Sequence, residues 1–508
     1  MRTSGILMHI TSLPGPYGVG TMGAQAYDFV DFLKAAGQSF WQILPLTPTG
    51  YGDSPYQSCS AFAGNYYLID LTALVRGGLL REEELQRIHW CDREDRADFG
   101  LLYENRLKVL RLAYGRFPGS EKFDGFCRAN ADWLSDFGLY MALKDRYQGK
   151  PWYEWEPGIR FRDPDAVWKA RHELGEEIRF YYFLQYLFHD QWQALHRYAL
   201  ENGIRIIGDV PIYVPLDSVD VWTSPELFQL DKSLTPVLVA GVPPDGFTAD
   251  GQLWGNPLYR WDRMAGDGYA WWIRRLRAAG SLYDTVRLDH FRGFSSYWAV
   301  PYGAPNAKDG KWLPGPGLPF IRAIQKALPD LQIIAEDLGY LTPEILKLRD
   351  ASGYPGMKVL EFAFDAKEPS DYLPHNYTSN SVCYIGTHDN MTMRQWLDTA
   401  DEKTRQYAWE YMNLSAEEGP VWGAIRTAFA SVSQLCVVQM QDFLNLGQEA
   451  RMNFPGTVSG DNWTWRMKDR STSPELSAAI RRLTKLYGRL AIQKYANAAM
   501  PLKIGEQK

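Results

Sequence analysis

The chain has 508 residues, of which 45% are hydrophobic, so a large buried core is expected and a disordered chain is excluded. Its formal net charge is −6, without a long run of one sign, which argues against nucleic acid or a membrane surface as a partner. The five cysteines are scattered and form no CxxC pair, which excludes a zinc ribbon and favours a reducing compartment.

The amino-terminal segment, residues 1–10, lacks the basic and then apolar pattern of a signal peptide. No apolar run reaches the ~20 residues that a transmembrane helix needs. We therefore expect a cytoplasmic protein. The aromatic residues are abundant, with 19 Trp, 30 Tyr and 23 Phe, and many lie beside Gly, Pro and Asp in predicted loops. Most belong in the core, but several of these loop residues suit sugar rings, which present apolar C–H faces and polar rims.

Short apolar runs rich in β-branched residues recur along the chain between amphipathic stretches, as buried parallel strands do. Because eight such runs alternate with helical patterns, the sequence predicts an α/β protein with a (β/α)8 barrel. The predicted strands are residues 5–10, 40–44, 204–208, 284–289, 332–336, 357–362, 382–386 and 435–440.

Helices are predicted between these strands. A first helix places Ala26, Phe29, Val30 and Leu33 on one face, and a later one, with its apolar face over 180–188, ends at 202–203. Thr342 and Ser473, each followed by proline, are typical of helix N-caps.

The spacing between the predicted strands is uneven. The gaps after the second and third strands are longer than one crossover helix needs. We therefore expect one catalytic domain over residues 1–508 with two insertions in its barrel: a mostly helical one at 62–176 and a loop-rich one at 215–280.

Carboxylates follow most of the predicted strands. Any one of them alone would more often be a helix cap or an ion-pair partner, but acids at the same position on five or six strands indicate a shared site. Since parallel strands end at one rim of a barrel, where active sites of this fold lie, we expect these acids to converge. They are Asp53, Asp209, Asp289, Glu336, Asp389 and Asp442.

Two of these acids differ in their surroundings. Arg287 and Asp289 lie two apart on one strand, so they share a face, and the guanidinium favours an ionised carboxylate, which suits a nucleophile. Glu336 follows an apolar run, where desolvation favours the protonated form that a general acid needs. Such a pair is what cleavage of a glycosidic bond requires. His388 next to Asp389 is equally compatible with a structural rim histidine.

Long motifs then carry a resemblance to a known family. VRLDHFRGF (286–294), IIAEDLG (333–339) and GTHDN (386–390) resemble the α-amylase clan of retaining glycosidases. More narrowly, the chain resembles the amylomaltase family, glycoside hydrolase family 77, from residue 5 to about 465. The further motifs are TSLPGPYGVG (11–20), GYGDSPYQS (50–58), SAFAGNYYLIDL (60–71), GDVPIYV (208–214), GVPPDGFTADGQLWGNPLY (241–259), EFAFD (361–365) and NFPGT (453–457).

The resemblance implies a role for each matching residue. It places the nucleophile at Asp289, the acid/base at Glu336 and a third carboxylate, which binds sugar hydroxyls, at Asp389. The residues it implies in substrate binding are Arg287, His388, Asp209, Tyr56, Asp53, Gln252, Trp254, Asn256 and Asn390.

The loop 245–257 matches the family's lid over the acceptor side. Two departures from the family pattern stand out: His9-Ile10 replaces an apolar residue and proline, and Gly246 occupies a lid position that is often aromatic. The first does not concern the catalytic set, whereas the second leaves the acceptor preference open.

The resemblance implies a 4-α-glucanotransferase that acts on maltooligosaccharides and starch-type α-1,4-glucans by retaining double displacement, without a cofactor. No metal is indicated, since the sequence has neither HExxH nor an EF-hand loop. An α-1,4-glucan hydrolase of the same clan is the alternative, and a non-catalytic glucan-binding protein is disfavoured because all three carboxylates are present. The oligomeric state stays open, and a monomer is compatible with the sequence.

Overall fold

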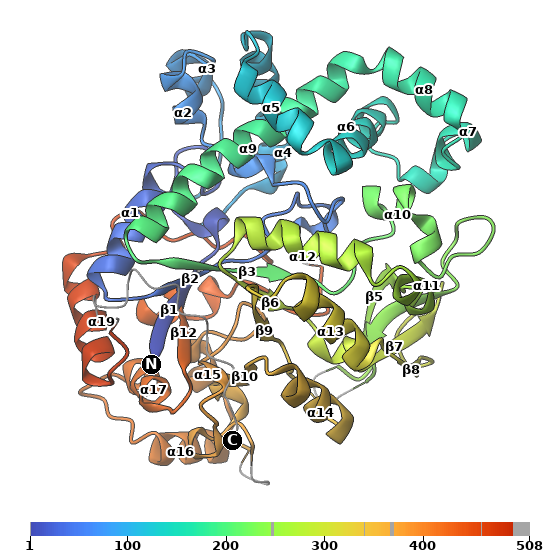
Figure 1. Cartoon of the computed structure of the whole chain (residues 1–508). Helices are drawn as coiled ribbons and strands as arrows, with labels where there is room; N and C mark the ends of the chain where they lie inside the picture. The colour runs from blue at the N-terminus through green and yellow to red at the C-terminus, as the bar shows by residue number, and fades with distance from the viewer. Residues whose placement is uncertain (1, 245–247, 340, 366–369, 459, 491–508) are drawn as a thin grey trace.

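The computed structural model has a closed barrel of eight parallel strands, in the order β1-β12-β11-β10-β9-β6-β3-β2 (Figure 1). It describes residues 2–244, 248–339, 341–365, 370–458 and 460–490. The fold class and all eight strand predictions are confirmed, with ends that differ by a few residues. The barrel strands are β1 (Thr3–Leu7), β2 (Phe40–Gln42), β3 (Arg205–Val210), β6 (Thr285–Leu288), β9 (Gln332–Ala335), β10 (Gly356–Val359), β11 (Ser381–Tyr384) and β12 (Leu435–Gln439).

The barrel strands are buried on both faces, which explains why their sequences are continuously apolar. Every residue of β2, β6, β11 and β12 is buried. The first helix, α1 (Ala24–Ala35), buries the predicted face. The predicted cap Thr342 precedes Pro343 at the start of α14 (Pro343–Ser352), and Ser473 accepts from the Leu476 N–H at the start of α19 (Pro474–Leu486).

Helices fill the chain between β2 and β3. The longest, α9 (Gly175–Glu201), has Asn202 as its C-cap, at the predicted stop, and runs diagonally across the upper half of Figure 1. Among them, α4, α5 and α6 pack directly on α9. The remaining helices of this stretch are α2 (Leu71–Arg76), α3 (Glu82–Gln86), α4 (Phe99–Gly115), α5 (Glu121–Ala129), α6 (Ala131–Arg146), α7 (Pro157–Arg160) and α8 (Pro164–Glu173).

A second, four-stranded antiparallel sheet of order β5-β4-β7-β8 lies beyond the ends of β3 and β6 (Figure 1). The stretch 215–280, expected to be loop-rich, contains two of its strands and three helices. The other two strands follow β6 and were missed, because they mix buried with partly or fully exposed residues. The strands are β4 (Leu238–Val242), β5 (Gln252–Pro257), β7 (Ser296–Pro301) and β8 (Lys311–Pro314), and the helices are α10 (Val219–Thr223), α11 (Trp261–Gly266) and α12 (Ala270–Leu282).

The remaining helices accompany the second half of the barrel. They are α13 (Gly317–Ala327), α15 (Met393–Thr399), α16 (Glu402–Tyr411), α17 (Pro420–Ala430) and α18 (Met440–Phe443). Within the described ranges, no helix is both long and apolar enough to cross a membrane.

The barrel closes where its first and last strands pair, from Thr3 opposite Leu435 onward. Arg489 is fully buried at this seam. Its guanidinium donates to the carbonyl oxygens of Thr3 (2.9 Å) and Ser433 (3.0 Å), and also to those of Phe429 (2.8 Å) and Ser431 (2.9 Å). A side chain from the far end of the described chain therefore ties both sides of the seam together.

Candidate active site

Arg287 lies at the centre of the predicted carboxylate cluster. Its Nη1 is 2.6 Å from Asp209 Oδ2 and 3.0 Å from Asp289 Oδ1. The side chains of Arg287 and Asp209 are almost fully buried, whereas that of Asp289 is 26% exposed. The parallel pairing of β3 and β6 sets Asp209 opposite Arg287 and thus makes the first contact possible. Asp289 is therefore the carboxylate of this cluster that reaches solvent, and it contacts a buried ion pair formed by Arg287 and Asp209.

Glu336 is held in a different way from Asp289. It follows β9, is 9% exposed, and accepts the backbone N–H of His290 at Oε2 (2.6 Å) and that of Leu338 at Oε1 (2.9 Å). Burial raises the pKa of Glu336 to about 8, with Arg287 lowering it and Asp289 raising it. The carboxyl group is therefore mostly protonated at pH 7.

The turn after Asp289 has the backbone conformation that this arrangement needs. His290 has φ 49°, a left-handed conformation that is uncommon outside glycine and is found at functional sites. It aims the His290 N–H at Glu336. Burial lowers the pKa of His290 to about 3, so its imidazole is neutral.

Asp289 has a shifted pKa as well. Burial raises it, while the Arg287 guanidinium lowers it. Arg287 contacts Asp289 directly, whereas two backbone N–H groups donate to Glu336. The guanidinium therefore favours ionisation of Asp289 more directly than that of Glu336.

Asp389 and His388 follow β11 on the loop 385–392. The side chain of Asp389 is 43% exposed and lies 3.5 Å from His388 Nε2. Asn453 Nδ2 donates to Asp389 Oδ1 at 2.6 Å, and Arg451 donates to the Asp389 carbonyl at 3.0 Å. Asn453 and Arg451 were not predicted as site residues. The motif NFPGT contains Asn453, but it indicated no role.

Tyr56 joins the two halves of the site. Its Oη donates to Asp209 Oδ2 at 2.8 Å, and its ring stacks on His388 with centroids 5.2 Å apart. Burial lowers the pKa of His388, so that this imidazole is also neutral at pH 7. The predicted residues Tyr56, Asp209 and His388 therefore form one wall with Arg287.

The predicted lid residues lie over the turn at His290. The Trp254 ring packs edge-on against the His290 ring, with centroids 4.8 Å apart, and its Nε1 donates to Gln252 Oε1 at 3.1 Å. Asn256 is buried at the end of β5. Gly246, the departure from the family pattern, lies outside the described residues.

Two other predicted binding residues have partners within the protein. Asp53 accepts from Tyr103 Oη of α4 at 2.5 Å, which turns its carboxylate toward the helical stretch. Asn390 Oδ1 accepts from the N–H (2.9 Å) and hydroxyl (2.8 Å) of Thr387, so it braces its own turn.

Asp442 corrects one expectation about the rim. It was counted with the acids at the strand ends, but its side chain is fully buried and its Oδ1 accepts the Met393 N–H at 2.7 Å. Burial raises its pKa to about 7. Asp442 therefore caps the first turn of α15. The sequence could not distinguish this cap from a rim acid, because both follow an apolar strand.

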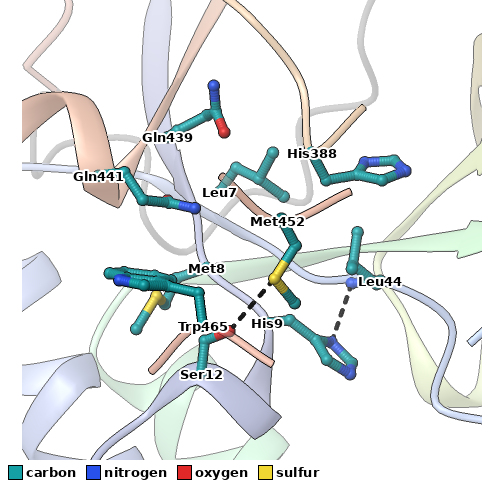
Figure 2. Close-up of a pocket in the computed structure, with 10 residues that line it drawn as sticks. All are labelled: Leu7, Met8, His9, Ser12, Leu44, His388, Gln439, Gln441, Met452 and Trp465. Atoms are coloured by element: carbon teal, nitrogen blue, oxygen red, sulfur yellow. Dashed lines mark hydrogen bonds between the residues drawn. The ribbon is translucent and has the colours of Figure 1, made fainter. Parts of the chain in front are cut away.

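The departure at His9 is structural. His9 Nδ1 accepts the Leu44 N–H at 3.2 Å, and burial lowers the His9 pKa to about 3. Figure 2 shows the His9 and His388 rings at separate places in the wall of a small pocket, which Leu7 and Gln439, the last residues of β1 and β12, also line. As for metals, no group of three or more His, Cys, Asp or Glu residues in the described part of the chain could hold an ion.

Comparison with known proteins gives consistent matches over nearly the whole chain. The glycoside hydrolase family 77 model, described as 4-alpha-glucanotransferase, matches residues 8–472. A 4-alpha-glucanotransferase of Clostridium butyricum is 47% identical over 95% of this chain and 100% of its own length. One from Thermus thermophilus is 46% identical over 96% and 99%. The solved amylomaltase from Streptococcus agalactiae in complex with acarbose is 43% identical, has a TM-score of 0.94, and is matched over 97% of this chain and 100% of that one.

Proposed function

Because the chain belongs to glycoside hydrolase family 77, the 4-alpha-glucanotransferases, we propose that Asp289, Glu336 and Asp389 divide the work of one retaining glycosyl transfer. The protein is a 4-alpha-glucanotransferase, and the full-length relatives of that name favour transfer over the hydrolase alternative. The residue roles and the substrate range below are the proposal.

The first step breaks the donor's glycosidic bond. Glu336 gives its proton to the glycosidic oxygen while an Asp289 carboxylate oxygen bonds to the anomeric carbon, and the reducing-end part of the glucan leaves as an alcohol. Glu336 is then ionised. In the second step an acceptor hydroxyl bonds to the same carbon and passes its proton to Glu336, and Asp289 is released. Two inversions retain the α configuration.

One observation carries this assignment: the two carboxyl groups meet different partners. Arg287 donates to Asp289, whereas Glu336 accepts two hydrogen bonds from backbone N–H groups inside a buried turn. That difference supports an ionised nucleophile beside a protonated acid. Asp389, held by Asn453, is proposed to bind hydroxyls of the reacting sugar, with Tyr56, Asp209 and His388 as its wall.

The proposed substrates are α-1,4-linked maltooligosaccharides and starch-type glucans. The proposed binding residues are Arg287, His388, Asp209, Tyr56, Asp53, Gln252, Trp254, Asn256 and Asn390. Gln252 and Trp254 cover the acceptor side beside His290. We also propose one catalytic domain over 1–508, with the stretches 62–176 and 215–280 as insertions, and a cytoplasmic location, which the five free cysteines support.

Maltotriose alone tests the proposed function. Transfer must yield glucose together with chains longer than maltotriose, and these new linkages must be α by NMR. Release of glucose and maltose without longer chains would mean hydrolysis instead. New β linkages would contradict the two-step mechanism. The same assay with Glu336→Gln should show neither pattern.

A further inference from the structure

Asn453 contacts the loop that carries the third proposed catalytic carboxylate at two points. Its side-chain Nδ2 donates to Asp389 Oδ1 at 2.6 Å, and its backbone N–H donates to the His388 carbonyl at 3.1 Å. Since a carboxylate only accepts hydrogen bonds, the nitrogen of the Asn453 amide is the atom that faces Asp389. The backbone contact fixes the distance between the two segments, so the amide is in place to hold the carboxylate.

Arg451 binds the backbones of the same two segments together. Its Nε donates to the Asn453 carbonyl at 2.8 Å, and its Nη2 donates to the Asp389 carbonyl at 3.0 Å. The guanidinium also lies 4.3 Å from the centroid of the Phe454 ring. Because a guanidinium is planar and its donors have a fixed geometry, Arg451 sets the backbone of Asn453 in one position relative to that of Asp389.

Trp463 connects the neighbour of Asn453 to the wall of the site. Its backbone N–H donates to the Met452 carbonyl at 2.7 Å. Its buried ring lies near the rings of Tyr56 and His388, with centroids 5.8 and 5.9 Å away. Trp463 has φ 67°, a left-handed conformation that is rare for a large side chain and persists where surrounding contacts enforce it. The chain before Asn453 is therefore fixed on this side as well.

These contacts give the two carboxylate oxygens of Asp389 different surroundings. Oδ1 accepts the hydrogen bond from Asn453, whereas Oδ2 lies 3.5 Å from His388 Nε2. The side chain is 43% exposed, so it has room to accept further hydrogen bonds from a ligand. The carboxylate of an aspartate rotates easily about its last bond, and the hydrogen bond from Asn453 restricts that rotation.

We propose that Asn453 is a positioning residue, which aims Asp389 so that Oδ2, beside His388 Nε2, accepts a hydroxyl of the reacting sugar in the transition state. The inference rests on the proposed role of Asp389. Hydrogen bonds to sugar hydroxyls strengthen in the transition state of glycosidic cleavage. A misplaced carboxylate loses that strengthening while the ground-state sugar still binds, so Asn453 affects kcat more than KM.

Asn453→Ala tests this role with maltotriose as the substrate. We expect kcat to fall about 10- to 100-fold, while KM changes less than about threefold. The loss should be absent when Asp389 is already alanine, because Asn453 acts through that carboxylate. α-Maltosyl fluoride, whose leaving group needs no proton, is the donor for comparing Asp389→Ala with the double variant. A kcat close to that of the wild type in Asn453→Ala, or an equal further loss in the absence of Asp389, would overturn the proposal.

Asn453→Asp adds a readout that a purely structural role would not change. It places a carboxyl group where the amide donates to Asp389, and two carboxyl groups so close share one proton. That proton bridges them as the amide hydrogen does, until rising pH removes it. Fluoride release from α-maltosyl fluoride, relative to the wild type, should therefore be highest at low pH and fall as the pH rises. The other titratable or charged groups around Asp389 stay unchanged in this variant, and they are His388, Arg451, Asp289 and Tyr56.

Asn462→Asp is the matched control, because Asn462 braces the same segment from within. Its Oδ1 accepts the Phe454 N–H at 3.0 Å, and its Nδ2 donates to the Thr457 carbonyl at 3.1 Å. A carboxylate at this position can still accept from Phe454, so the pH dependence should match that of the wild type. The same new alkaline fall in Asn462→Asp, or its absence in Asn453→Asp, would contradict the positioning role.

The thermal unfolding midpoint of each variant is recorded alongside. Full activity of Asp389→Ala would refute the function proposed for that residue and this inference with it. A slow Asp389→Ala enzyme beside an unimpaired Asn453→Ala enzyme would refute this inference alone.

Discussion

Arg287 gives the two proposed catalytic carboxyl groups different tasks at the scale of single residues. Its guanidinium contacts Asp289 and Asp209 at once, so it acts on Asp289 by contact and on Glu336 only through space. Substituting each acid should therefore have a different chemical consequence.

The first prediction separates the acid from the nucleophile. Glu336→Gln should slow transfer from maltotriose about 10²- to 10⁴-fold, because no proton reaches the leaving oxygen. A donor whose leaving group needs no proton, such as α-maltosyl fluoride, should restore formation of the glycosyl-enzyme in this variant. The same donor should not rescue Asp289→Ala, which lacks the attacking oxygen.

Both variants should unfold at temperatures close to that of the wild type. Rescue of Asp289→Ala by the fluoride, or full activity of either variant on maltotriose, would contradict the assignment.

The second prediction concerns pH. The acid step needs protonated Glu336, whose pKa burial raises to about 8, so kcat/KM for maltotriose should hold up to that pH and fall as the pH rises through it. Asp209→Asn removes a negative charge that offsets the positive charge of Arg287. Because Arg287 then lowers the pKa of Glu336 more strongly, the fall in kcat/KM should move to lower pH.

The control substrate is again α-maltosyl fluoride, whose first step should lack the alkaline fall. If the fall stays in place in Asp209→Asn, or is equally present with the fluoride, it belongs to another group.

At the scale of elements, the segment before and within β5 is the proposed lid, and its start is fixed by contacts to the connection between β7 and β8. The Ala307 N–H donates to the Asp250 carbonyl at 3.1 Å, and Lys308 forms an ion pair with the Asp250 carboxylate. Gly251 and Gly255 have φ of 66° and 76°, which lets the chain bend on either side of Trp254. The connection between β7 and β8 thus holds the lid while Trp254 stays over His290.

The third prediction follows from that arrangement. Water can resolve the glycosyl-enzyme as well as a sugar can, and transfer wins only where the acceptor is oriented and water is not. Trp254→Ala should therefore raise the ratio of free glucose to transfer products from maltotriose, with transfer falling more than total cleavage. The matched control is Trp168→Ala, because Trp168 is exposed on α8. An unchanged ratio in Trp254→Ala would contradict the role of the lid and leave the catalytic assignment intact.

For the whole molecule, the barrel could be predicted from the sequence because burial on both faces requires strands that are apolar at nearly every position. The small sheet could not, since strands such as 311–314 are short and exposed on most residues. The same limit applies to the site. Asp289 and Glu336 could be identified because each follows a predicted strand. The hydrogen bond from Asn453 to Asp389 joins residues 64 positions apart, so no local sequence pattern indicates it.

The fourth prediction concerns the seam of the barrel. Arg489→Met removes a donor from four backbone carbonyls, of which that of Ser431 still accepts from Arg2 at 2.7 Å. A buried carbonyl left without a partner costs about 1–3 kcal/mol, so the loss at the other three should lower the free energy of unfolding in urea by at least about 3 kcal/mol. Arg481→Met is the control, since the Arg481 contacts are exposed and long, at 3.4 and 3.5 Å, and should change stability by less than about 0.5 kcal/mol. Equal effects of the two substitutions would contradict the role of Arg489.

That seam also has a genetic consequence. The ribosome synthesises β12 more than four hundred residues after β1, with which it pairs. The edge of β1 that pairs with β12 therefore stays unpaired during most of synthesis, and an unpaired strand edge can form non-native pairings. Arg489 is translated later still. A premature stop codon shortly before position 489 would therefore yield a protein that contains every residue proposed for catalysis but lacks the Arg489 hydrogen bonds across the seam between β1 and β12. We expect such late nonsense alleles to behave as loss-of-function alleles.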